Sequence, residues 1–288
     1  MNQRIIKRTG FGALAIILIM GGMIACSDSE LTDPLNSTED GTLRMLLVDA
    51  PAQIQNVDSL IVVFDRVLVH RNEEADTSSA DGWVTVLSDT LPAEERTFNL
   101  LELVNGVFAT LGEVDLEPGI YTQIRIMLES ASLVIDGGSQ DLFIPSGDQT
   151  GIKLVDSFTV DPAVITELTV DFDVARSLHE APPGSENYIL RPTIRLVQKS
   201  LSGSISGTVT PAGIGSVIYA LEPFTRDTIT TTLPDSVSGE YVLQALLEGT
   251  YDIRAAAEGY QDSTVTGVMV TAGTVTPDID FELEPLSQ

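Results

Sequence analysis

Apolar residues recur at every second position over most of this chain, and that spacing restricts what the chain can fold into. Leu168, Val170 and Phe172 alternate with polar neighbours, and the same spacing recurs over residues 124–128. A period of two is the period of a β-strand with one buried face. The β-branched run over residues 60–69 is typical of a central strand. We therefore expect an all-β protein.

The alternation falls into two blocks, over residues 41–199 and 203–286, and it lapses between them near Ser200–Ser202. Short strands separated by turn residues suit a β-sandwich, so we predict two β-sandwich domains of immunoglobulin-like or transthyretin-like architecture. In the second block the expected strands are seven: 204–209, 217–221, 228–232, 241–243, 251–255, 265–270 and 279–283.

Two local patterns give finer predictions for the first block. Gly137-Gly138 predicts a hairpin turn between strands at 133–135 and 142–144. A short helix is expected over Leu100–Val104, with Asn99 as its cap and Gly106 after its end.

A glycine, a tyrosine two positions later and then an Ile-Arg pair occur in both blocks, as Gly119-Ile120-Tyr121 with Ile124-Arg125 and as Gly249-Thr250-Tyr251 with Ile253-Arg254. A tyrosine that opens a strand after such a turn can tie a loop to the strand through its hydroxyl group, as in sandwich domains. We interpret the two as shared architecture rather than as a shared ligand site.

Cys26 is the only cysteine, so it has no partner for a disulfide within the chain, and the cores must stabilise both blocks. It follows three basic residues and an apolar stretch over residues 11–25, which is shorter than the ~20 residues that span a bilayer. Residues 1–25 therefore read as an export signal. There are two alternatives to a lipid-anchored chain. The protein could be cut at another position and secreted, or the apolar stretch could be an anchoring helix.

Residues 23–26, Met-Ile-Ala-Cys, resemble the lipobox of bacterial lipoproteins. The resemblance implies that the Cys26 sulfur carries diacylglycerol, that the signal is cut before it, and that the new amino terminus is acylated. Two or more acyl chains anchor a protein stably. Ser27 stands where an aspartate favours retention in the inner membrane, which points to the outer membrane of a Gram-negative bacterium. Residues 26–40 are polar and acidic and predict a flexible tether.

The excess of acidic over basic residues excludes some classes of binding partner. The formal charge is −27, and after removal of residues 1–25 the chain holds 12 basic and 42 acidic residues, which gives −30. Such a surface repels phosphate backbones, so we expect no nucleic-acid partner. It also repels anionic headgroups, so lipid on Cys26 must hold the protein at the membrane. Most of the acids form a solvated surface in this interpretation, and cation binding is the alternative.

Most of the first block, from Gly41 to Val197, resembles a family known as domain of unknown function 4382, which is common in bacterial lipoproteins. The name implies no activity. The motifs that carry the resemblance are Asp49-Ala50-Pro51, Asn99-Leu100-Leu101, Leu116-Glu117-Pro118-Gly119-Ile120-Tyr121, Pro145-Ser146-Gly147, Gly151-Ile152-Lys153, Asp171-Phe172-Asp173 and Arg191-Pro192.

The second block is similar to the carboxypeptidase regulatory-like domain, a transthyretin-type sandwich. The similarity implies an accessory domain of a carbohydrate-binding-like fold group, which is a statement about fold rather than about function. The matching residues are Ile205-Ser206-Gly207-Thr208-Val209, Gly239-Glu240-Tyr241, Gly249-Thr250-Tyr251 and Gly259-Tyr260.

Catalytic residues are scarce in the sequence. His70 and His179 are the only histidines, and both are expected at exposed strand-end or loop positions. The zinc-protease pattern H-E-x-x-H does not occur. Residues 203–207 have the glycine spacing of a nucleophile elbow, but Ile205 stands where the serine belongs. We predict no catalytic residues and a protein that is not an enzyme.

Asp171 and Asp173 are the acids of most interest, because strand alternation puts both on one face. Two carboxylates could bind calcium if a loop supplied further oxygen ligands, and calcium is the one cofactor we consider. The plainer interpretation is a solvated sheet face or side chains that cap a turn. Asp49 is expected to shape the turn into Pro51.

Four aromatic residues are candidates for a platform on which a sugar ring could stack, although a packing role suits each. They are Trp83, Tyr188, Tyr219 and Tyr260.

The leading hypothesis is a non-enzymatic, lipid-anchored envelope protein that binds or scaffolds a glycan or protein partner. A carbohydrate-binding accessory lipoprotein of a glycan-capture system is the first alternative. A hydrolase with an unrecognised carboxylate pair is the second. The sequence does not specify the ligand.

Overall fold

The computed structural model describes residues 39–50, 57–72, 82–145, 151–182, 184–185 and 187–286. The predicted signal over 1–25, Cys26 and the tether up to residue 38 lie outside these residues. The described part of the chain is all-β, as predicted, with one single-turn helix, α1 (Val174–Ser177). No helix within it is long and apolar enough to cross a membrane.

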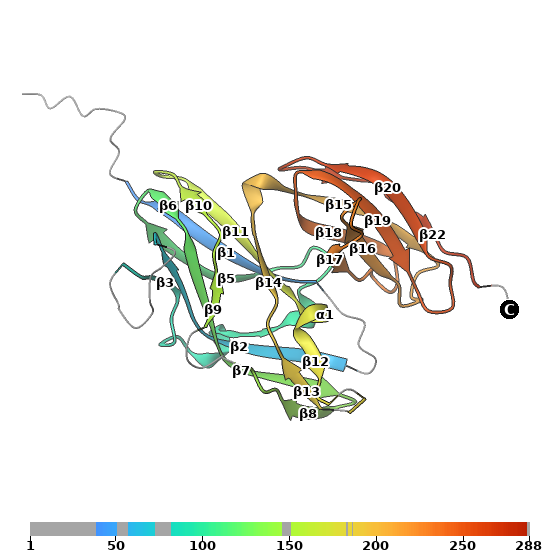
Figure 1. Ribbon diagram of the computed structural model, residues 1–288, viewed down its shortest axis with the longest axis horizontal. Helices are drawn as coiled ribbons and strands as arrows, with labels where there is room; N and C mark the ends of the chain where they lie inside the picture. Colours follow the sequence, from blue (N-terminus) through green and yellow to red (C-terminus); the bar gives the residue numbers. More distant parts are fainter. Residues whose placement is uncertain are drawn as a thin grey trace, which may run out of the picture. The chain divides into compact units, whose positions relative to one another are not determined.

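One sheet of the first block has the strand order β14-β11-β1-β5 (Figure 1). Its central strands, β1 and β11, run parallel, and β5 and β14 pair with them in antiparallel fashion. The bounds are β1 (Gly41–Ala50), β5 (Ala109–Leu116), β11 (Ile165–Asp173) and β14 (Ile194–Gln198).

The second sheet has the order β3-β2-β7-β8, with β4 also pairing β2 and β9 also pairing β7. The long strand β2 lies inside this sheet, which confirms the central strand predicted over residues 60–69. The bounds are β2 (Val57–His70), β3 (Val84–Leu87), β4 (Thr97–Asn99), β7 (Gln123–Ile135), β8 (Gly138–Asp141) and β9 (Ile152–Leu154). Two small pairs complete the block: β6 (Gly119–Tyr121) with β10 (Phe158–Val160), and β12 (Leu178–Glu180) with β13 (Tyr188–Leu190).

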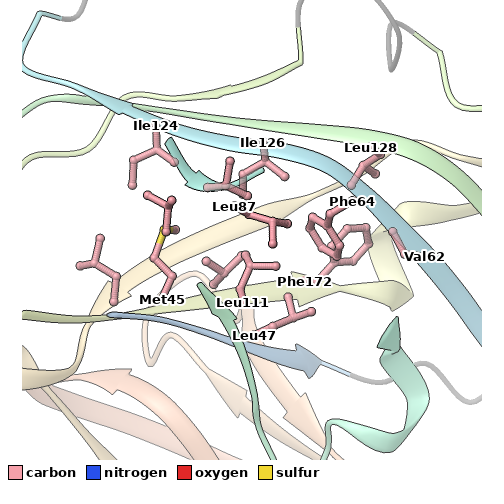
Figure 2. Close-up of a cluster of buried hydrophobic side chains, with 14 of the residues drawn as sticks. Met45, Leu47, Val62, Phe64, Leu87, Leu111, Ile124, Ile126, Leu128 and Phe172 are labelled. Atoms are coloured by element: carbon pink, nitrogen blue, oxygen red, sulfur yellow. The ribbon is translucent and has the colours of Figure 1, made fainter. Parts of the chain in front are cut away.

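The apolar faces of these two sheets enclose one core (Figure 2). Phe64 of β2 and Ile126 of β7 point toward Met45 of β1, Leu111 of β5 and Phe172 of β11 in this cluster. All five side chains are buried. Alternate positions of each strand therefore supply the core, as period-two spacing requires.

The second block consists of two further sheets around a separate hydrophobic cluster. Their orders are β18-β15-β21, with β22 also pairing β15, and β17-β16-β19-β20. All seven strands predicted here are present, the last of them shortened, and β21 is additional. The bounds are β15 (Ser202–Thr210), β16 (Val217–Leu221), β17 (Thr228–Thr232), β18 (Glu240–Leu247), β19 (Gly249–Ala256), β20 (Ser263–Val270), β21 (Val275–Thr276) and β22 (Phe281–Glu282).

The helix expected over Leu100–Val104 is instead a 3₁₀ turn over Leu100–Glu102. Asn99 is at the N-cap position, as predicted, but its side chain makes no capping hydrogen bond. Its Nδ2 donates to Glu102 Oε1 at 2.8 Å, and its Oδ1 accepts from the Leu60 backbone N–H at 3.3 Å. Asn99 therefore joins this turn to β2.

The hairpin predicted at Gly137-Gly138 is present but shifted by one residue. Its turn residues are Asp136 and Gly137, both with positive φ (47° and 75°), and the returning strand is β8 rather than residues 142–144. Two successive residues with positive φ give the turn that matches the twist of a hairpin.

Residues Thr38–Gln288 form one compact unit, in which a 3₁₀ turn over Lys199–Leu201 separates β14 from β15. One hydrophobic cluster lies within residues 41–199 and the other within 203–286, and the division into two domains stays a prediction. That each block folds independently stays a prediction.

Candidate functional site

Three carboxylates gather where the parallel strands β1 and β11 end. Asp171 and Asp173 of β11 pair in register with Val48 and Ala50 of β1, which flank Asp49. The solvated face considered for Asp171 and Asp173 is wrong, because only 2% and 8% of the two residues is exposed. Residues from outside β11 cover them.

The Asp171 carboxylate is bound by groups from both blocks. Its Oδ2 accepts from Arg195 Nη2 at 2.6 Å and from Thr230 Oγ1 at 3.3 Å. Burial raises the pKa of this carboxyl group, and the Arg195 guanidinium opposes the rise. Arg195 also donates to the Ala245 carbonyl oxygen at 2.8 Å, so one ion pair ties β11 and β14 to β18.

Asp173 is the N-cap of α1. Its Oδ1 accepts from the Arg176 backbone N–H at 2.9 Å, and its Oδ2 lies 3.3 Å from Arg176 Nε. Burial raises the pKa of Asp173, and the bond from the Arg176 N–H opposes the rise. The capping role is one of the alternatives that the sequence left open for this residue.

Asp49 is 4% exposed and carries an unsatisfied oxygen. Its Oδ1 accepts from the Val174 backbone N–H at 3.2 Å, while its Oδ2 has no hydrogen-bond partner among the described residues. Burial raises the pKa of this carboxyl group well above its usual range, and the charges of Asp171 and Asp173 raise it further. Pro51 lies outside the described residues, so the predicted turn is not seen. Asp49 instead joins β1 to α1.

Calcium at Asp171 and Asp173 stays a prediction, and the local chemistry argues against it. No group of three or more His, Cys, Asp or Glu residues in the described ranges is arranged to hold a metal ion. The Arg195 guanidinium already occupies Asp171 Oδ2, and the Arg176 side chain lies on Asp173 Oδ2. Asp171 Oδ1 has no hydrogen-bond partner among the described residues, but the positive charge of these two guanidinium groups opposes the binding of a further cation.

A hollow of about 390 Å³ lies where the ends of β2, β3 and β5 meet the turn into β6, and we call it the Trp83 hollow. Trp83 lines it and packs against His70, with 5.0 Å between ring centroids. Gly82 has φ +75° and lies against the His70 ring, where a Cβ atom would overlap Nε2. His70 Nδ1 accepts from the Asn72 N–H at 2.7 Å, so strand-end contacts fix this ring.

Arg71 supplies hydrogen-bond donors to the same hollow. Its Nη2 donates to the carbonyl oxygens of Glu117 and Pro118, at 3.0 Å each. Its guanidinium lies 5.3 Å from the Tyr121 ring centroid, and Glu117 Oε2 lies 3.4 Å from Nη1. Contacts to three residues therefore hold a charged donor in one position.

The two tyrosines after glycine turns make the loop contact that the sequence predicts. Tyr121 donates from its hydroxyl to the Glu117 carbonyl oxygen at 3.1 Å, and Tyr251 donates to that of Leu247 at 2.8 Å. Each bond spans four residues and closes the turn onto its strand. Tyr121 also stacks on Phe158, with 5.4 Å between ring centroids.

The other sequence candidates lie apart from these groups. His179 is exposed on β12 rather than in a loop, and Tyr188 lies on β13. Tyr219 of β16 lies under the Arg254 guanidinium, 4.4 Å from its ring centroid. Tyr260 bridges to Pro285. Only Trp83 of the four aromatic candidates belongs to the Trp83 hollow.

Several solved protein structures have low similarity to this chain. GBS52, the minor pilin of Streptococcus agalactiae, is 14% identical with a TM-score of 0.23 over 85% of this chain and 97% of that one. A putative adhesin from Bacteroides ovatus is 10% identical with a TM-score of 0.23, over 85% and 91%. The TIE protein of Bacillus anthracis is 12% identical with a TM-score of 0.24, over 86% and 34%. The chain thus spans about a third of the TIE protein's length. TM-scores this low do not show a common fold.

No curated protein sequence matches the chain significantly. Residues 40–192, more than half of the chain, match the family described as Domain of unknown function (DUF4382). The match lies in the first block, as the sequence motifs predict, and it includes Asp49, Trp83, Asp171 and Asp173. The similarity of the second block to the carboxypeptidase regulatory-like domain stays a prediction. The chain therefore belongs to the Domain of unknown function (DUF4382) family.

Proposed function

We propose that this protein is a non-enzymatic envelope lipoprotein, anchored through lipid on Cys26, that binds or scaffolds a partner at the cell surface. The observation that carries the proposal is the sequence Met23-Ile24-Ala25-Cys26 at the end of a short apolar segment. An acidic body of charge −30 has no electrostatic attraction to anionic lipid, so covalent lipid must supply the anchor.

The contacts of the ionisable residues support a binding role rather than catalysis. His70 accepts a backbone N–H and packs on Trp83. Asp171 and Asp173 are buried in contacts with Arg195 and Arg176. These side chains are used to hold elements together, whereas the Trp83 hollow lies between strand ends and has the volume of a small-molecule site.

Lipid labelling tests the anchor. The full chain, expressed in a Gram-negative host with radiolabelled fatty acid, should take up label and fractionate with the outer membrane. Cys26→Ala should lose both the label and the membrane association, because it removes the sulfur that carries the lipid. Ser27→Ala is the matched control at the neighbouring position, and it should keep both. Label retained on Cys26→Ala would overturn the proposal.

A further inference from the structure

We propose that the Trp83 hollow is a binding site for a neutral saccharide. The inference deepens the proposed binding function and rests on it. The volume of the Trp83 hollow, about 390 Å³, lies within the range of small-molecule sites, which is roughly 300–1,000 Å³. The hollow combines the aromatic ring of Trp83 with hydrogen-bond donors and acceptors that are held in place.

The aromatic ring supplies the apolar contact. Trp83 is half-buried at the wall of the hollow, and the His70 ring supports it. A tryptophan is an amphipathic platform with a large flat face, on which the C–H face of a pyranose ring can pack. Because Gly82 has no side chain, Trp83 and His70 can approach as they do.

Hydrogen-bonding groups line the same hollow. The two carbonyl oxygens take both Nη2 hydrogens of Arg71 and, with the Tyr121 ring, hold its guanidinium in place, so Nε and Nη1 are the atoms that can donate to a ligand. Asp115 accepts the Thr42 hydroxyl at 2.9 Å through Oδ1, which orients its carboxylate. Sugar hydroxyl groups both donate and accept, so they match fixed donors and fixed carboxylates together.

The charges select the class of sugar. Asp40, Asp115 and Glu117 line the hollow beside the guanidinium of Arg71. Three carboxylates against one guanidinium disfavour an anionic ligand, such as a uronic acid, because like charges repel. A neutral sugar carries no such cost.

Binding of a chain that begins at Ser27, and keeps the compact unit 38–288, to an array of neutral and uronic-acid oligosaccharides tests the site. We expect binding to neutral members and weaker or no binding to uronic acids. Trp83→Ala should weaken the binding about tenfold, the scale of one lost aromatic contact. Trp83→Phe should restore part of it.

Tyr219→Ala is the matched control, since Tyr219 is also a half-buried aromatic residue but lies on β16 and does not line the hollow. It should leave the binding unchanged. Thermal unfolding of each variant separates loss of fold from loss of binding. No binding to any neutral sugar, preference for uronic acids, or full binding by a folded Trp83→Ala variant would each overturn the inference. None of these outcomes alters the lipid labelling of Cys26, so the anchor and the ligand are tested separately.

Discussion

The hydroxyl groups of Tyr121 and Tyr251 should contribute differently to stability, because they differ in exposure. Tyr121 is 3% exposed and bonds the Glu117 carbonyl oxygen, whereas the bond from Tyr251 to Leu247 is exposed. Tyr121→Phe should lower the free energy of unfolding by about 1 kcal/mol, as for one typical hydrogen bond. Tyr251→Phe should cost less, because water can replace its partner. Chemical denaturation measures both, and a larger loss at Tyr251 would contradict the assignment.

We expect the ionised Asp49 carboxylate to make the folded protein less stable at neutral pH than a neutral side chain would. Its raised pKa means that the folded state holds a proton at pH values where the unfolded chain, with an ordinary pKa of 3.8, has lost it. The contribution of Asp49 to stability is therefore greatest below this window, and it decreases as the pH rises through the folded-state pKa. Asp49→Asn keeps an oxygen for the Val174 N–H and removes the buried charge.

We expect Asp49→Asn to raise the free energy of unfolding at pH 7.5 by about 1–3 kcal/mol, because the amide removes a buried negative charge that lies near Asp171 and Asp173. The gain should shrink as the pH falls toward 4. Asp161→Asn changes the same charge at an exposed position and is the control. Denaturant titrations at several pH values measure the difference. A variant at position 49 that is less stable than the native chain at pH 7.5 would contradict this account.

At the scale of strands, the ion pair between Asp171 and Arg195 connects β11 and β14 to β18. Arg195→Ala leaves a buried carboxylate with one remaining hydrogen bond, from Thr230. Loss of one member of a buried pair costs about 3–5 kcal/mol, and the partial exposure of Arg195, 29% for its side chain, favours the lower end. The double variant with Asp171→Asn should lose less than the two single losses added together. Additive losses would show that the two side chains are not coupled.

The strands could be predicted from sequence because period-two spacing is local information. Residues 60–69 and 168–172 fall in β2 and β11 for this reason. The parallel pairing of β1 with β11 could not be predicted, since Thr42 meets Ile165 across 123 residues without a local signal. The hairpin was displaced by one residue because Asp136, and not Gly138, takes a positive φ.

The same limit applies to the candidate sites. Alternation placed Asp171 and Asp173 on one face, but the burial of Asp171 depends on Thr230, which is 59 positions away. Trp83 was a candidate on residue type alone. The Trp83 hollow joins it to Asp40, Arg71 and Asp115, which come from separate strand ends, so only the folded chain brings them together.

For the whole molecule, the remaining question is whether the two hydrophobic clusters fold separately. The clusters share no residue, yet polar contacts cross between the blocks. Asn105 accepts the Val242 N–H at 2.6 Å and donates to the Glu240 carbonyl oxygen at 3.2 Å. Asp171 accepts the Thr230 hydroxyl. We infer two folding units that stabilise one another, because their apolar cores are complete in themselves while these polar groups are not.

Two shorter chains, 41–197 and 203–286, should therefore each unfold cooperatively, and each should be less stable than the same block in the whole chain. The loss should be greater for the first, since Asp171 keeps Arg195 but loses Thr230. Asp171→Asn should recover part of that loss in the shorter chain, because a neutral amide has a lower cost of burial than a carboxylate. Calorimetry and denaturant unfolding measure both chains. If either chain shows no cooperative transition, the two clusters belong to a single folding unit, and the boundary near Ser200–Ser202 does not separate domains.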